Sequence, residues 1–63
     1  MSNKIVTVWY DHISEEHGYV IDLQDADGLY LTVNVLDDRE EAVEFAKRYA
    51  EHRCYFFKDL TDR

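Results

Sequence analysis

The sequence predicts a single α+β domain in which one helix packs on one face of a small antiparallel sheet. Three segments are rich in β-branched and aromatic residues, and one amphipathic segment follows them. A chain of 63 residues has room for one hydrophobic core only. We therefore expect one domain over residues 1–63, with a three-stranded antiparallel sheet, a helix and a short fourth strand in the order β-β-β-α-β.

The predicted strands span residues 4–10, 19–24 and 29–36. In the second and third segments, apolar residues alternate with the others, so each strand should have one core face. The residues in the core phase are Tyr19, Ile21, Leu23, Leu29, Leu31, Val33 and Val35. The turn at residues 25–28 ends in Asp27-Gly28, which favours a tight antiparallel hairpin. The polar connection at residues 11–18 predicts a solvated loop.

The helix is predicted to begin after Asp37 or Asp38 and to end near His52. Either aspartate can cap the helix, and a glutamate lies three residues after each of them. Alanines occupy the centre of the apolar face, which favours close approach to a sheet. Residues 54–58 then predict the short fourth strand.

One helix covers one face of a sheet, so the opposite face should lack cover within the chain. The first strand is apolar on both faces, and the sequence leaves open which of them meets the helix. The alternatives are Ile5, Thr7 and Trp9, or Val6, Val8 and Tyr10, joined on the uncovered face by Val20, Tyr30 and either Tyr55 or Phe57. We expect an interface at this face, around Trp9, Val20 and Tyr30, because large exposed apolar patches usually mark one.

The net charge of −7 is distributed unevenly along the chain. Residues 11–36 contain six acids and no lysine or arginine. They predict an acidic rim on the hairpin side, formed by Asp11, Glu15, Glu16, Asp22, Asp25 and Asp27. Such a rim either serves solubility or steers association with a basic partner protein. Direct nucleic-acid binding is disfavoured, because phosphates require clustered lysines and arginines.

Catalytic and metal-binding patterns are weak in this sequence. No convergent nucleophile and base are evident, so we expect neither an enzyme nor a cofactor. The best metal candidates are His12 and His17, with Asp11, Glu15 and Glu16 between or beside them, although an ordinary polar loop explains the same residues.

The cysteine content and the apolar runs bear on the compartment. The single Cys54 cannot close an intrachain disulfide, and the apolar runs fall far short of the ~20 residues that span a bilayer. We therefore expect no membrane segment and a reducing cytoplasm.

Two stretches resemble a known family. Residues 18–23 (GYVIDL), which follow a polar hairpin loop, and residues 37–46 (DDREEAVEFA) are similar to the second strand and the helix start of HicB-like antitoxins. The resemblance covers about residues 4–53 and implies occlusion of a small basic RNase toxin without catalysis. In size and charge the chain is also similar to small acidic phage inhibitors of host defence, including anti-CRISPR and anti-restriction proteins.

The function expected from the sequence is therefore non-enzymatic. The chain would bind and inhibit a basic, nucleic-acid-handling protein, such as a nuclease, a toxin or a CRISPR effector, through the acidic rim. The alternative is a homodimerisation module that uses the uncovered sheet face. A metal-dependent function at His12 and His17 is the third hypothesis.

Overall fold

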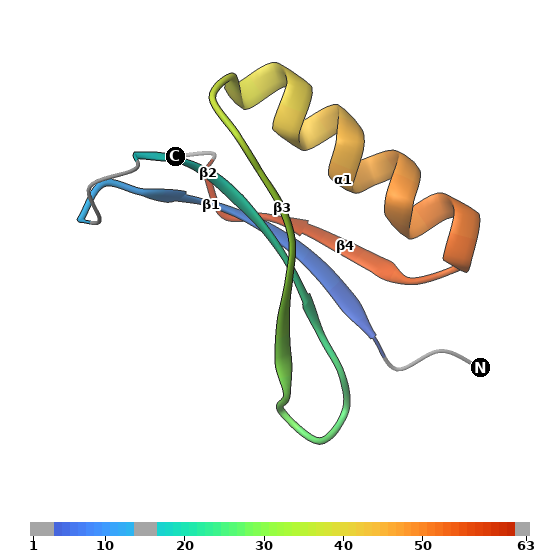
Figure 1. Cartoon of the computed structure of the whole chain (residues 1–63). Coiled ribbons are helices and arrows are strands. Elements are labelled where there is room, and N and C mark those ends of the chain that lie inside the picture. Colours follow the sequence, from blue (N-terminus) through green and yellow to red (C-terminus); the bar gives the residue numbers. More distant parts are fainter. Residues whose placement is uncertain (1–3, 14–16, 62–63) are drawn as a thin grey trace.

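A computed structural model describes residues 4–13 and 17–61 of the chain. Four strands form one sheet in the order β3-β2-β1-β4, and one helix lies across one face of it (Figure 1). The elements are β1 (Ile5–Asp11), β2 (Gly18–Gln24), β3 (Tyr30–Leu36), α1 (Arg39–Arg53) and β4 (Phe56–Asp59). The predicted β-β-β-α-β order, the antiparallel three-stranded core and the packed helix are confirmed.

The sheet is mixed because the fourth strand enters it in parallel. Strands β1 and β2 pair antiparallel, as do β2 and β3, whereas β4 pairs with β1 in parallel. Helix α1 carries the chain from β3 at one edge to β4 at the other, which is the crossover that a parallel strand requires. The sequence predicted the fourth strand but did not say which strand it pairs with. In the structure it pairs with β1.

The core lies between α1 and the sheet and is built from small side chains. Val6, Val8 and Ile21 are fully buried on the sheet side. Ala42, Ala46 and Ala50 are buried on the helix side and bring the helix backbone close to the strands. The first strand therefore turns its Val6 face toward the helix, which settles the choice that the sequence left open. Larger residues pack around this centre, among them Tyr19, Leu23, Phe45, Tyr49 and Phe57.

The predicted core face of the third strand is wrong in two respects. Leu29 and Leu31 are exposed rather than buried, and the alternation reverses in the second half of the strand. The β2–β3 register shifts so that Ile21 pairs with Asn34 while Asp22 pairs with Thr32, which leaves Val33 as an extra residue in a bulge. Beyond the bulge, the residues predicted to face the core face the opposite side of the sheet, and their neighbours face the core. Leu36 packs against the core and Val35 is exposed on the other face.

The helix begins as predicted and ends one residue later than predicted. Asp38 is the N-cap, and its Oδ1 accepts a hydrogen bond of 3.3 Å from the backbone N–H of Glu40. The helix continues through Arg53, whose guanidinium lies 4.0 Å from the centre of the Tyr49 ring. A charged residue on the apolar arc thus finds an aromatic face to pack on, so it does not stop the helix.

Cys54 was predicted as the first residue of the fourth strand, and this prediction is wrong. It is the C-cap of α1, in the left-handed conformation at φ 57°, and its backbone N–H donates to Glu51 O at 3.3 Å. Its thiol is free and the residue is exposed. Strand β4 begins two residues later, at Phe56. Within the described residues, no helix is both long enough and apolar enough to cross a membrane.

Candidate protein-binding surface

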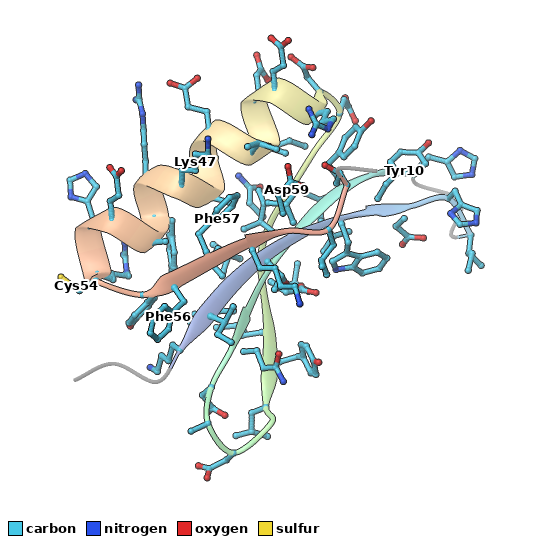
Figure 2. The ribbon with its side chains drawn as sticks, turned by 180° about the vertical axis from the view of Figure 1, so that it is seen from behind. Tyr10, Lys47, Cys54, Phe56, Phe57 and Asp59 are labelled. Carbon is cyan, nitrogen blue, oxygen red and sulfur yellow. The ribbon has the colours of Figure 1, made fainter. Side chains whose placement is uncertain are left out.

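The face of the sheet opposite α1, here called the open face, is uncovered by any element of the described chain. Its residues follow from the strand registers and from the position of the buried Val6 face. They are Ile5, Thr7 and Trp9 on β1, Val20, Asp22 and Gln24 on β2, Tyr30, Thr32 and Val35 on β3, and Phe56 and Lys58 on β4. In Figure 2, Phe56 points away from α1, whereas its neighbour Phe57 points toward the helix. The open face therefore carries Phe56, and neither Tyr55 nor Phe57, which pack against the core.

The open face exposes several large apolar side chains. Tyr30 is 67% exposed, Phe56 66% and Val35 48%. Of the three residues expected at an interface, Tyr30 is exposed, Trp9 is half-buried and Val20 is buried among its neighbours. All three lie on this face, and their role in binding stays a prediction. Sequence reasoning missed Val35 and Phe56, because a bulge and a shifted strand start placed them there.

A buried carboxylate organises the middle of the open face. Asp22 Oδ2 accepts a hydrogen bond of 2.6 Å from Trp9 Nε1, and Oδ1 accepts one of 3.2 Å from Thr32 Oγ1. Asp22 is only 9% exposed, so these donors offset the cost of removing its charge from water. Asp22 was expected on the acidic rim. It is instead a structural residue that joins side chains of β1, β2 and β3.

A shallow hollow of about 430 Å³ lies over this network. Trp9, Tyr30 and Lys58 line it together with Asp22, and Leu60 contributes from the segment after β4. Half of its eight lining residues are aromatic or aliphatic, and the other half are polar or charged, namely Thr7, Asp22, Gln24 and Lys58. The hollow therefore offers apolar surface together with a carboxylate, an ammonium and neutral hydrogen-bonding groups.

The other acids expected on the rim do not form one surface. Asp11 lies at one end of β2, across from Gly18, whereas Asp25 and Asp27 lie beyond the opposite end. A strand of seven residues separates the two sites by about 20 Å. The two remaining rim residues, Glu15 and Glu16, lie outside the described residues. The described acids of the predicted rim, apart from the buried Asp22, are therefore divided between the two hairpin ends of the sheet, and their role in binding stays a prediction.

Two of these aspartates also shape their own loops. Asp11 Oδ1 accepts a hydrogen bond from Ile13 N at 3.0 Å. Asp25 Oδ1 accepts from Asp27 N at 3.0 Å and from Leu29 N at 3.1 Å, which closes the hairpin turn. These are Asx turns, in which an aspartate satisfies nearby backbone donors. Local structure accounts for part of the acidity that the sequence analysis assigned to a partner.

Arg39 has a structural role that the sequence analysis missed. Its Nη2 lies 3.1 Å from Asp59 Oδ2, and its Nε donates to Thr61 Oγ1 at 2.9 Å. These bonds tie the first turn of α1 to the end of β4. The sequence carried one signal for this role, which is that Arg39 is the only lysine or arginine among residues 11–44.

The structure brings no metal cluster together in the part of the chain that it describes. Within residues 4–13 and 17–61, no three His, Cys, Asp or Glu side chains lie close enough to hold an ion. His12 and His17 are both exposed, and the His12 ring stacks on Tyr10 with 6.2 Å between ring centres. Because Glu15 and Glu16 lie outside the described residues, the complete candidate set stays a prediction.

Comparison with known proteins supplies no function for this chain, so a functional assignment has to rest on the chain's own geometry. No protein-family model, curated protein or solved structure matches the chain significantly. The resemblance to HicB-like antitoxins thus stays a prediction.

Proposed function

We propose that this chain is a non-enzymatic protein-binding module that inhibits a basic, nucleic-acid-handling partner. The observation that supports it best is the open face, which presents Tyr30, Val35 and Phe56 to solvent with no element of the described chain over them. Exposed apolar groups with aromatic members are typical of protein interfaces. A domain of this size has a small core, so a bound partner would also stabilise it.

The charge supports a basic partner protein. A net charge of −7 attracts a positively charged surface over a distance and accelerates the encounter. Nucleases, toxins and CRISPR effectors carry such surfaces, because they bind phosphates. Because the described rim acids lie at two separate ends of the sheet, we assign the attraction to the acidic chain as a whole and the contact to the open face.

The bases of the chain argue against direct binding to nucleic acid. Arg39 and Arg48 pair with carboxylates, and Arg53 packs on an aromatic ring. The Lys4 ammonium lies 5.6 Å from the centre of the Tyr55 ring. These four bases are all engaged in contacts within the chain, which makes them less available to phosphates.

An inhibition assay tests the proposal. A panel of purified basic RNases and DNases would be assayed with and without the chain, at low and high salt. We expect at least one enzyme to be inhibited, with affinity falling as salt rises. The substitution Val35→Glu should abolish inhibition, whereas the matched change Ile13→Glu, at an exposed loop position away from the sheet, should preserve it. Equal potency of the two variants would contradict the role of the open face.

The structure also favours a second candidate, homodimerisation through the same face. In its central part, as far as the structure describes it, the open face has one acid, Asp22, and one base, Lys58. Two acidic chains would therefore meet there with little repulsion between like charges. Sedimentation equilibrium tests this candidate: a concentration-dependent dimer that Val35→Glu dissociates supports it, and a monomer at high micromolar concentration excludes it.

A further inference from the structure

Strand β3 forms an edge of the sheet, and the first half of this strand lacks the usual protection of an edge. It pairs with β2 on one side only. Residues 29–36 (LYLTVNVL) contain no charged residue and no proline, the two residue types that commonly block edge pairing. Leu29 is 68% exposed and Leu31 63%. Figure 1 shows the β2–β3 hairpin extending well beyond α1, so this part of the edge is not covered by the helix.

The outward backbone groups of the edge can be assigned from one hydrogen bond. Asp25 N donates to Leu29 O at 3.2 Å, so Leu29 faces β2. Antiparallel residues alternate between facing their partner strand and facing away from it. With Leu23 opposite Leu31, Leu31 also faces β2, and the backbone N–H and C=O of Tyr30 and Thr32 point away from the sheet.

The second half of β3 is closed to such pairing. The bulge at Val33 breaks the regular spacing of the backbone groups. The backbone N–H of Val35 already donates to the Asn34 side chain, with 2.9 Å between nitrogen and Oδ1. The open stretch is therefore Leu29–Thr32, and it meets the open face where the side chains of Tyr30 and Thr32 lie.

We propose that an extended segment of the partner adds to the sheet beside Tyr30–Thr32 as a fifth strand. This inference rests on the proposed function and specifies how the partner binds. Main-chain hydrogen bonds to Tyr30 and Thr32 provide the pairing. The exposed side chains of Tyr30 and Leu31 lie on opposite faces of the sheet, and each contacts the residues of the incoming segment that point to its own face.

The charges at the two ends of β3 define the chemistry of that segment. Asp25 and Asp27 precede the strand, and Asp37 and Asp38 follow it. An apolar segment with lysine or arginine at its ends complements this pattern. A second copy of the chain does not, because both ends of its β3 are acidic. Parallel and antiparallel pairing of two β3 strands would each place carboxylates beside carboxylates.

A matched pair of variants at Tyr30 isolates the backbone contribution. Tyr30→Pro removes an N–H that faces away from β2, a position where an edge strand tolerates proline. Tyr30→Ala removes the same side chain and keeps the N–H. The probe is a nine-residue peptide in which five alternating valines and threonines lie between two pairs of lysines. A second peptide carries glutamates in place of the lysines.

The measurement is a titration of the full ¹⁵N-labelled chain, followed by NMR and amide hydrogen exchange. We expect the lysine peptide to shift and protect the amides of Tyr30 and Thr32, and to bind roughly tenfold more tightly than the glutamate peptide. Tyr30→Pro should bind it roughly tenfold more weakly than Tyr30→Ala, with both variants retaining the native spectrum elsewhere.

Three results would overturn strand addition. The first is equal affinity of Tyr30→Pro and Tyr30→Ala for the lysine peptide. The second is no response at β3. The third is protection of the Tyr30 and Thr32 amides that depends on the concentration of the chain alone, which would assign the edge to a second copy. Shifts confined to residues around Trp9 and Phe56 would reject strand addition and leave the proposed open-face function standing, whereas nuclease inhibition tests that function separately.

Discussion

The indole Nε1 of Trp9 donates a 2.6 Å hydrogen bond to the buried carboxylate of Asp22, on the face of the sheet that the helix does not cover. This bond places a charged group beneath the aromatic surface that we propose for binding. Thr32 Oγ1 donates to the other oxygen of the same carboxylate at 3.2 Å. The face is therefore held in shape by polar contacts that cross three strands, while Tyr30, Val35 and Phe56 on the same face stay exposed.

Replacing Asp22 should destabilise the fold. Asp22→Ala leaves the Trp9 N–H and the Thr32 hydroxyl without their acceptor, so we expect the free energy of unfolding to fall by about 1–3 kcal/mol. Urea unfolding monitored by the fluorescence of Trp9, the single tryptophan, measures the change. Asp27→Ala is the control, because this exposed turn residue should change stability by about 0.5 kcal/mol or less. Equal effects of the two substitutions would show that the network contributes nothing.

The alanine face of the helix should not tolerate larger residues. Ala46 is fully buried against the sheet, and Ala46→Leu adds volume where the helix backbone lies close to Val6 and Val8. We expect a loss of about 1–3 kcal/mol in unfolding free energy, measured by urea denaturation. Lys47→Leu introduces the same side chain on the outer surface of α1, where Figure 2 shows Lys47 pointing away from the sheet. Its stability should stay within about 0.5 kcal/mol of the native chain.

The sequence predicted the fold well where a pattern is local and periodic. Alternation identified β2, and the Asp38 cap and the alanine spacing identified α1. The Val33 bulge broke the same rule in β3, because a bulge depends on the fit between two strands and leaves no periodic signal in either one. The parallel pairing of β4 with β1 likewise depends on the crossover and on nothing within residues 54–58.

The candidate site was predicted in part, for a related reason. The uncovered face was predicted because a single helix can cover only one of the two faces of a sheet. Trp9, Val20 and Tyr30 do lie on that face. The acidic rim could be predicted only as a stretch of sequence, because the positions of its members in space depend on the strand register and on hydrogen bonds. A strand separates Asp11 from Asp25, and hydrogen bonds from neighbouring strands draw Asp22 into the structure.

The tie between α1 and β4 should make a measurable contribution to stability. Arg39→Ala removes the ion pair with Asp59 and the bond to Thr61, and we expect a loss of about 1 kcal/mol because the pair is only partly exposed. Thermal unfolding measures the effect, and added salt should reduce the difference between variant and native chain. Arg48→Ala breaks the fully surface pair with Glu44 and should cost roughly half as much or less. A larger loss for Arg48→Ala would contradict this assignment.

The C-cap at Cys54 offers a position where the fold can be stabilised. A residue with a Cβ in the left-handed conformation is strained by roughly 1 kcal/mol, and glycine is not. Cys54 has φ 57°, so Cys54→Gly should raise the unfolding free energy by about 0.5–1 kcal/mol, measured by thermal or urea unfolding. Cys54→Ala keeps the Cβ and should show no such gain, which separates relief of backbone strain from loss of the thiol.

Because the Cys54 thiol is exposed, a maleimide reagent should label the native chain as fast as the urea-unfolded chain. Slow labelling of the native chain together with no gain from Cys54→Gly would place this residue inside the structure rather than at a helix end.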